Sequence, residues 1–220
     1  MKMRPELLAL FPAGVAGAEL LRLEDAGALW AEERASAPGA APRRLRELAA
    51  GRHCAREALG ALGFAAVALP QRPDRRPAWP AGAVGSISHS GDYCAAVVAR
   101  RAGCAGIGLD AERWGRVRPE IWRRIATAPE LAWLERLGDD ADRWATRLFS
   151  AKEAFYKAQY ARSERFLGFA DAAFHPHDEG AFEIELLVEV PGLGRPGDRF
   201  PGRLESCVER CYAGVHLPDG

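Results

Sequence analysis

The chain has 220 residues, 48% of them apolar and 27% charged, which is typical of a globular protein with one large domain or two small ones. Thirty acidic residues balance thirty basic ones, which excludes the global positive field expected of a nucleic-acid or membrane-surface binder. No run of about 18 apolar residues occurs, so we expect neither a membrane span nor a membrane partner.

The first third of the chain is expected to be mainly helical. Residues 16–36 predict a short helix, followed by the small-residue loop SAPGAAP. A second helix is expected to begin near Pro42, because leucine and alanine recur there at three- and four-residue spacing, with arginines off that stripe. Gly63 is expected to end this helix.

Residues 70–85 are rich in proline and arginine and predict a loop with a stiff backbone. The sequence VGSISHSGDYCAAVVARR comes next. It favours two short strands joined by a turn over Ser90, Gly91 and Asp92, which is a β-hairpin. His89 is expected at this turn.

The second half begins with AGIGLDAE, in which apolar residues alternate with glycines and acids. Because side chains alternate between the faces of a strand, Asp110 and Glu112 are expected on one face at a strand end. Helices are expected at 129–137 and 141–161, and strands at 182–190, 199–207 and 210–217. With no regular βαβ alternation, the chain predicts an α+β fold with helices packed against largely antiparallel sheets.

The five cysteines are an odd number in a long chain without a secretory signal, which favours reduced thiols and a cytoplasmic location. Cys207 and Cys211 with His216 lack a fourth partner for zinc. We therefore expect free and mostly buried thiols.

Lysine is rare here, and its placement is informative. Two of the three lysines, Lys152 and Lys157, lie five residues apart in FSAKEAFYKA, whereas every other basic residue except Lys2 is an arginine. A compact, mobile ammonium suits a site where a planar guanidinium does not. Phosphate held beside a metal-binding carboxylate is such a site.

Asp110 and Glu112 form a carboxylate pair, and Glu153 offers a third carboxylate. Such oxygen ligands hold small hard cations such as Mg²⁺. Taken alone, the pair is better explained as a solvated strand end. Residues 150–153 also have the form of a helix capping box, and Glu153 could form a surface ion pair with Lys157. Gly106 and Gly108 leave room either for a ligand or for close packing of two halves.

Three motifs together resemble the signatures of the 4′-phosphopantetheinyl transferases. They are GSISHS (85–90), GIGLDAE (106–112) and FSAKEAFYKA (149–158), in the family's order and at its separations. Residues 42–63, 75–80 and 165–172 further resemble the enterobactin-synthase-component-D-like branch of the surfactin-type group. Ser90 departs from that branch, which commonly has cysteine there. The resemblance covers about residues 40–175.

The resemblance implies an enzyme that transfers the 4′-phosphopantetheine moiety of coenzyme A to a serine of an apo acyl or peptidyl carrier protein and releases adenosine 3′,5′-bisphosphate. It implies two similar α+β halves with pseudo-twofold symmetry, with the ligand in the cleft between them. We expect the halves at 1–104, on the 3′-phosphate and adenine side, and at 105–220, on the metal and pyrophosphate side. This fused architecture favours a monomer.

The resemblance also assigns the site residues. It implies Mg²⁺, with Mn²⁺ as a second candidate, bound by Asp110, Glu112 and Glu153. Catalytic roles fall to Glu153, Lys157 and His89, with either Glu153 or a metal-bound water as the general base. Contacts to coenzyme A are implied for Arg44, Arg52, Arg75 or Arg76, Ser88, His89, Lys152 and Lys157.

Two other functions share some of these features. A coenzyme A-binding paralogue without activity would not need the complete set of acids and lysines. A Mg²⁺-dependent nucleotide phosphohydrolase would not need the arginine-rich helix at 42–56. The arginines and tryptophans of residues 113–124 predict a docking surface for the carrier, with a solvated loop and helix as the plainer explanation. The sequence leaves open whether the pathway makes fatty acids, polyketides, nonribosomal peptides or siderophores.

Overall fold

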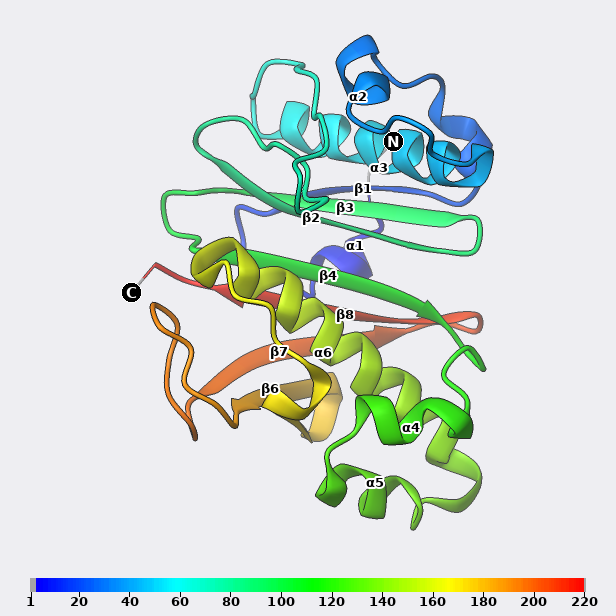
Figure 1. Cartoon of the computed structure of the whole chain (residues 1–220), viewed down its shortest axis with the longest axis vertical. Helices are drawn as coiled ribbons and strands as arrows, with labels where there is room; N and C mark the ends of the chain where they lie inside the picture. Colours follow the sequence, from blue (N-terminus) through cyan, green and yellow to red (C-terminus); the bar gives the residue numbers. More distant parts are fainter. Residues whose placement is uncertain (1–2, 220) are drawn as a thin grey trace.

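The computed structural model describes residues 3–219 and confirms the α+β class. Two antiparallel sheets lie one above the other in Figure 1, each with a long helix packed against it. The three-stranded sheet has the order β1-β3-β2, and the five-stranded sheet has the order β4-β8-β7-β6-β5. These are the two α+β halves that the sequence predicts. Within residues 3–219, no helix is long and apolar enough to cross a membrane.

The first sheet comes from the N-terminal half of the chain. Its strands are β1 (Ala16–Leu20), β2 (Ala83–Ser90) and β3 (Tyr93–Arg100). Between β1 and β2 lie η1 (Leu23–Ala26), α2 (Ala31–Ala35) and α3 (Pro42–Ala61). The apolar stripe of α3 packs on this sheet and forms one core with it. The helix begins at Pro42 as predicted, because proline is favoured in the first helical turn.

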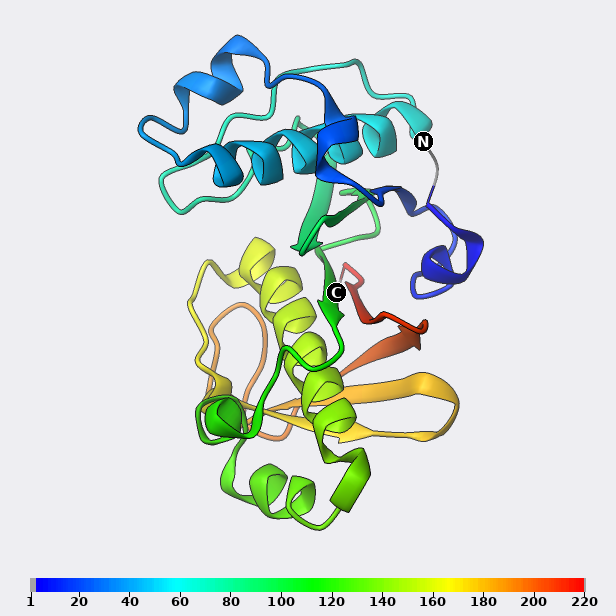
Figure 2. The ribbon, with the colours of Figure 1, turned by 90° about the vertical axis from the view of Figure 1, so that its right-hand side faces the viewer.

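The second sheet comes from the C-terminal half. Its strands are β4 (Gly106–Arg113), β5 (Ala172–Pro176), β6 (Ala181–Leu186), β7 (Arg199–Ser206) and β8 (Arg210–Leu217). The helices are α4 (Pro119–Ile125), α5 (Ala128–Leu134) and α6 (Ala141–Ser163), with short 3₁₀ turns η2 (Gly138–Asp140), η3 (Phe169–Asp171) and η4 (Asp178–Gly180). Figure 2 shows α6 lying across this sheet, with α4 and α5 at its far end.

A line of serines joins the two halves where β2 runs alongside β4. The Oγ atoms of Ser86, Ser88 and Ser90 accept hydrogen bonds from the backbone N–H groups of Leu109, Ala111 and Arg113, at 3.0, 3.1 and 3.3 Å. Side-chain hydroxyls therefore replace the backbone ladder of an ordinary sheet at this seam. A third apolar core lies here and includes Tyr93, Ile107 and Tyr212.

The N-terminal segment crosses to the second half. Helix α1 (Pro5–Leu8) and Phe11 pack into the core at the seam, and Leu10 and Phe11 lie against Gly214 of β8. Arg4 also links the halves, because its guanidinium contacts Glu19 of β1 at 3.0 Å and the Tyr212 hydroxyl at 3.0 Å. The division into 1–104 and 105–220 stays a prediction, since this segment belongs by contact to both parts.

The structure corrects several local expectations. Residues 16–20 form strand β1 instead of a helix, because pairing with β3 outweighs the helical preference of alanine and leucine. Strand β6 ends at Leu186, where the chain turns toward the Val190–Gly194 bridge. Strand β5 and helix α4 were not predicted as separate elements. His89 lies inside β2, paired with Cys94, and not at the turn.

Candidate active site

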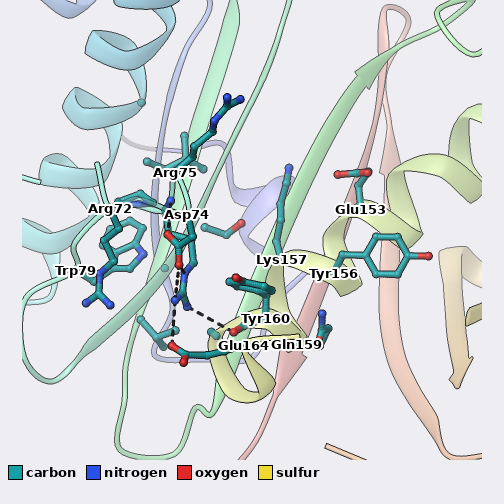
Figure 3. A pocket seen from close by; sticks show the side chains of 18 of the residues that line it. Arg72, Asp74, Arg75, Trp79, Glu153, Tyr156, Lys157, Gln159, Tyr160 and Glu164 are labelled. Atoms are coloured by element: carbon teal, nitrogen blue, oxygen red, sulfur yellow. Dashed lines mark hydrogen bonds and ion pairs between the residues drawn. The ribbon is translucent and has the colours of Figure 1, made fainter. Parts of the chain in front are cut away.

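A cavity of about 710 Å³ lies between the two halves. Its wall comes from α3, the loop at 71–82, strand β2, and the C-terminal part of α6 with the residues after it. Figure 3 shows Glu153, Tyr156 and Lys157 of α6 on one side and Arg72, Arg75 and Trp79 of the loop on the other. A volume of this size is typical of a small-molecule site. The cavity therefore has arginines of one half and charged groups of the other half among its lining residues.

Arg52 is a buried cation in the cavity wall. It lies on α3, is only 4% exposed, and its Nε donates to the Leu69 carbonyl at 2.6 Å. Its Nη2 has no hydrogen-bond partner within residues 3–219. Burial lowers the pKa of this guanidinium to about 10. A buried cation with an unused donor indicates a place for an anion.

Arg44 and His89 lie further along the same wall. The Arg44 Nη1 lies 3.2 Å from His89 Nε2 and 3.4 Å from a Glu47 oxygen. Burial, with help from the nearby cations Arg44 and Lys157, lowers the pKa of His89, although Glu47 opposes that effect. A neutral imidazole whose Nε2 accepts from Arg44 is consistent with this contact.

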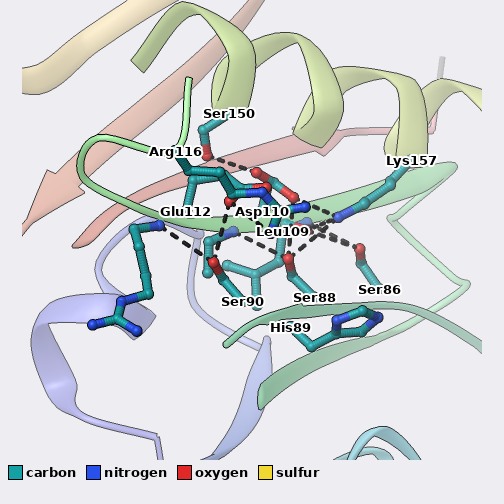
Figure 4. Close-up of polar contacts among 12 residues, drawn as sticks. Ser86, Ser88, His89, Ser90, Leu109, Asp110, Glu112, Arg116, Ser150 and Lys157 are labelled. Carbon is teal, nitrogen blue, oxygen red and sulfur yellow. Dashed lines mark hydrogen bonds and ion pairs between the residues drawn. The ribbon is translucent and has the colours of Figure 1, made fainter. Parts of the chain in front are cut away.

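Asp110 is the centre of a polar network at the seam (Figure 4). Its Oδ1 accepts from Ser88 at 3.0 Å and from the Lys157 ammonium at 2.7 Å, and its Oδ2 accepts from Ser150 at 2.9 Å. Asp110 is only 3% exposed, so the expectation of a solvent-facing strand end is wrong. Ser150 lies within α6 and donates to Asp110, so residues 150–153 are not a capping box.

Glu112 and Glu153 lie near this network and carry unusual pKa values. Burial, followed by the nearby charge of Asp110, raises the pKa of Glu112 to about 7. Its carboxylate accepts from Ser90 at 3.1 Å and lies 3.4 Å from the Arg116 guanidinium. Burial also raises the pKa of Glu153, with Asp110 adding to the effect and Lys157 opposing it. Lys157 pairs with Asp110 and not with Glu153.

The three acids fit a hard divalent cation by their chemistry. Burial and then the charge of Asp110 raise the pKa of both Glu112 and Glu153, which shows that negative charge is crowded around Asp110. However, within residues 3–219 no three His, Cys, Asp or Glu side chains are already arranged as a metal cluster. Cation binding would therefore require the Asp110–Lys157 ion pair to rearrange.

The structure corrects the expectation that Lys152 contacts the ligand. Its side chain is 0% exposed and does not line the cavity. The ammonium donates to Glu130 at 2.7 Å and to the carbonyls of Ile125 and Phe169. Lys152 therefore ties α6 to α4, α5 and η3, which is a structural role. Only Lys157 of the two lysines reaches the cavity.

The other predicted coenzyme A contacts divide into two groups. Ser88 points its hydroxyl toward β4 and is 4% exposed, so its side chain belongs to the seam. Arg75 is exposed, lines the cavity and has a left-handed backbone at φ 70°. Arg76 also lines the cavity, but Asp74 and Glu164 already occupy its guanidinium.

Gly106 and Gly108 are needed for helix packing. A Cβ on either residue would collide with the α6 backbone, at the carbonyl of Ala158 or of Ala154. Neither a ligand nor packing between the halves explains them, because α6 belongs to the same half. The spacing of the two glycines instead matches one turn of the helix that covers them.

Three cavity residues were not singled out from the sequence. Glu47 contacts Arg44 and lies 3.8 Å from His89, Trp79 covers Gly85, and the Tyr156 hydroxyl donates to the Gly168 carbonyl at 3.0 Å. A signal for Tyr156 was present, since it lies between the two lysines of FSAKEAFYKA. The other two depend on contacts between distant segments.

The chain belongs to the 4′-phosphopantetheinyl transferase superfamily. The model of the 4′-phosphopantetheinyl transferase N-terminal domain matches residues 32–99, and the model of the 4′-phosphopantetheinyl transferase superfamily matches residues 106–194. The predicted resemblance and the predicted two-half fold are thereby confirmed.

Three curated relatives match most of the chain, and two of them are named as 4′-phosphopantetheinyl transferases. The chain is 40% identical to 4′-phosphopantetheinyl transferase Npt of Nocardia iowensis over 207 residues, which are 88% of this chain and 91% of Npt. It is 41% identical to Svp of Streptomyces mobaraensis over 182 residues, 80% of this chain and 73% of Svp. It is 36% identical to enterobactin synthase component D of Escherichia coli (strain K12) over 146 residues, 65% of this chain and 67% of that protein. The chain is therefore an enzyme of the phosphopantetheinyl transferase class, and the branch expected from the motifs is consistent with these relatives.

Proposed function

We propose that this enzyme moves the 4′-phosphopantetheine moiety of coenzyme A to a serine hydroxyl of an apo acyl or peptidyl carrier protein, in a Mg²⁺-dependent reaction. The observation that carries the proposal is the cavity between the halves, which has a buried, unsatisfied arginine in one wall and Glu153 and Lys157 in another, with Asp110 2.7 Å behind Lys157. Coenzyme A is an extended polyanion with its 3′-phosphate and pyrophosphate well apart. Its 3′-phosphate matches the arginine region, and its pyrophosphate matches the Lys157 region, where a bound Mg²⁺ would add the positive charge that the carboxylates otherwise cancel.

Arg44, Arg52 and Arg75 would hold the 3′-phosphate and adenine end. Arg52 supports this assignment best, because its guanidinium is buried with a free donor. The pyrophosphate would then lie near His89, Glu153 and Lys157, all of which line the same cavity. Positioning and neutralising the phosphates supply most of the catalysis in phosphoryl transfer.

Asp110, Glu112 and Glu153 would hold Mg²⁺. When bound, the ion supplies positive charge that polarises the attacked phosphate. Lys157 then has two roles that its position allows. It balances the charge of Asp110 in the structure described here, at 2.7 Å, and it can turn to the pyrophosphate oxygens as the ligand enters.

In the transfer step, the serine oxygen forms a bond to the phosphorus attached to pantetheine. The bond from that phosphorus to the bridging oxygen breaks, and adenosine 3′,5′-bisphosphate leaves with the electron pair. Glu153, whose side chain lines the cavity, accepts the serine proton, and Lys157 stabilises the departing phosphate.

The test is mass spectrometry of an apo carrier protein incubated with the enzyme, coenzyme A and Mg²⁺. A gain of one phosphopantetheine, with adenosine 3′,5′-bisphosphate as the second product, is expected, and chelation of the metal should stop it. Coenzyme A binding without a mass gain would instead indicate an inactive paralogue. Hydrolysis of nucleotides without carrier modification would indicate a phosphohydrolase.

Two further proposals concern the oligomeric state and the cellular compartment. We propose a monomer, because one chain supplies both walls of the cavity. We propose a reducing cytoplasm as the working compartment, because all five cysteines are free and four of them are buried.

A further inference from the structure

Arg76 joins the loop at residues 71–77 directly to the C-terminal end of α6. The Arg76 guanidinium donates to Asp74 of its own loop at 2.7 Å and to Glu164, which caps α6, at 3.1 Å. It also lies 4.6 Å from the ring centroid of Tyr160. Figure 3 shows Asp74, Tyr160 and Glu164 meeting at the edge of the cavity. We call these four residues the clasp.

The loop is built to present Arg76 in this direction. The backbone N–H of Arg72 donates to the Arg76 carbonyl at 2.8 Å, and Gln71 pairs with Pro77. Asp74 binds both the backbone N–H and the side chain of Arg76. Arg75, at the left-handed position, is the exposed member of the pair. Neighbouring arginines therefore have different environments.

The clasp lies on a border between the halves that the serine seam does not reach. The serine seam holds β2 to β4 along one border, whereas loop 71–77 has no backbone pairing with the C-terminal half among the described residues. At the α6 end, the Arg76 cation also lies close to the negative pole of the helix, since its Nη1 lies 3.5 Å from the Tyr160 carbonyl in the last turn and Glu164 is the C-cap. The clasp thus adds a second link between the wall that carries the arginines and the wall that carries Lys157, on the side away from the serine seam.

We propose that Arg76 is a positioning residue that holds loop 71–77 against the end of α6 and does not bind the 3′-phosphate itself. This inference rests on the proposed function, because coenzyme A must touch both cavity walls for their separation to matter. A closed clasp pre-organises the walls and so raises the affinity for coenzyme A without contacting the reacting atoms. The clasp thereby leaves the 3′-phosphate contact to Arg75, Arg44 and Arg52.

A double-mutant cycle on Arg76 and Glu164 tests this, with coenzyme A binding measured by calorimetry on the full chain. The variants are Arg76→Met, Glu164→Gln and the double substitution. Arg76→Met should weaken coenzyme A binding by roughly fivefold. Glu164→Gln should also weaken binding in the wild-type background, and this loss of affinity should be roughly threefold larger than in the Arg76→Met background. In steady-state assays KM for coenzyme A should rise while kcat stays nearly unchanged. Arg76→Lys should recover part of the loss, because it keeps the ion pair but not the planar stack on Tyr160.

The sign of the coupling decides between the two roles of Arg76. If its guanidinium binds the 3′-phosphate, removing the competing Glu164 carboxylate should strengthen binding more when Arg76 is present, and that result would overturn the proposal. Strictly additive effects would overturn it as well. Arg162→Met is the matched control, because Arg162 is an exposed cation in the same last turn and does not line the cavity. It should bind as the wild type does. A wild-type chain that fails to bind coenzyme A would instead refute the proposed function.

Discussion

At the scale of single residues, Asp110 is more buried and makes more hydrogen bonds than its place near a strand end suggests. Both of its oxygens are used, by Ser88, Ser150 and Lys157. Removing the carboxylate would leave a half-buried ammonium and two hydroxyls without their partner. Its contribution to function therefore cannot be measured without a measurement of stability.

We expect Asp110→Ala to abolish transfer and to lower the free energy of unfolding by about 2 kcal/mol, because buried hydrogen-bonding groups lose their partner. Chemical denaturation and the carrier mass assay check the two effects separately. Asp110→Asn is the control, since it keeps much of the hydrogen bonding and removes the charge. An Asp110→Ala enzyme with wild-type turnover would contradict the metal-binding role of this residue.

Lys157 and Arg52 are expected to affect different kinetic constants. Lys157→Ala should lower kcat by roughly 100-fold, because its ammonium meets charge that grows in the transition state. Arg52→Ala should mainly raise KM for coenzyme A, by roughly tenfold, because it would bind a phosphate that does not react. Steady-state kinetics with a saturating carrier measures both. Equal changes of both constants in the two variants would show that the ligand ends are misplaced.

Cys207 should be the first thiol to react with an alkylating reagent. Burial acts to raise its pKa, but hydrogen bonds from the backbone of Glu209 and Arg210 outweigh burial and lower it. By contrast, burial raises the pKa of Cys211 to about 12 and that of Cys104 to about 11. Mass spectrometry of the native chain after brief exposure to iodoacetamide should show one modified cysteine, at position 207. Rapid modification of any buried cysteine would contradict this expectation.

At the scale of elements, the packing of α6 on β4 positions the site, since β4 carries Asp110 and Glu112 and α6 carries Glu153 and Lys157. The backbone of α6 can approach β4 this closely because Gly106 and Gly108 have no side chains. The same pair of elements therefore links stability to catalysis.

Gly108→Ala should destabilise the protein by about 3 kcal/mol, because the added Cβ would overlap the α6 backbone and cannot be accommodated by a side-chain rotation. Gly60→Ala is a matched control that should change the stability in the opposite direction. Gly60 lies in α3 with open space around its Cβ position, so alanine should stabilise that helix by about 0.5–1 kcal/mol. Thermal unfolding of both variants is the measurement. Similar stability of the two variants would refute this account of the packing.

At the scale of the whole molecule, the predicted carrier surface at 113–124 is exposed but differs from expectation in two residues. Trp122 is buried in the core and cannot serve as an anchor. Arg116 lies 3.4 Å from Glu112, so reversing its charge would disturb the acidic cluster. Trp114 remains half-buried, with the Arg143 guanidinium 4.6 Å from its ring centroid. An exposed, cationic surface thus continues from the loop after β4 onto α6.

Charge reversal at Arg118 and Arg123 tests docking there, since both side chains are exposed. We expect KM for the carrier to rise by roughly fivefold and its salt dependence to weaken, because complementary charge steers association. KM for coenzyme A should stay nearly unchanged, as should all constants of the Arg162→Glu control. If the carrier KM and its salt dependence keep their wild-type values, the carrier docks elsewhere.

The sequence alone was sufficient for the family and the α+β class. These depend on local patterns: the alternation in GIGLDAE, the helical spacing in FSAKEAFYKA and the proline that begins α3. The sequence did not predict strand β1, because alanine and leucine in AGAEL favour a helix. The strand forms only because it pairs with β3, a contact that the local sequence does not show.

Only the tertiary structure decided which charged groups are free to meet a ligand. Lys152 and Lys157 have similar sequence surroundings, yet Lys152 is enclosed with Glu130 whereas Lys157 lines the cavity. Arg75 and Arg76 are neighbours, yet only Arg76 is held by Asp74 and Glu164. The physical reason is that the deciding partners are distant in the chain, Glu130 at 22 positions from Lys152 and Glu164 at 88 positions from Arg76, and no local pattern encodes such contacts.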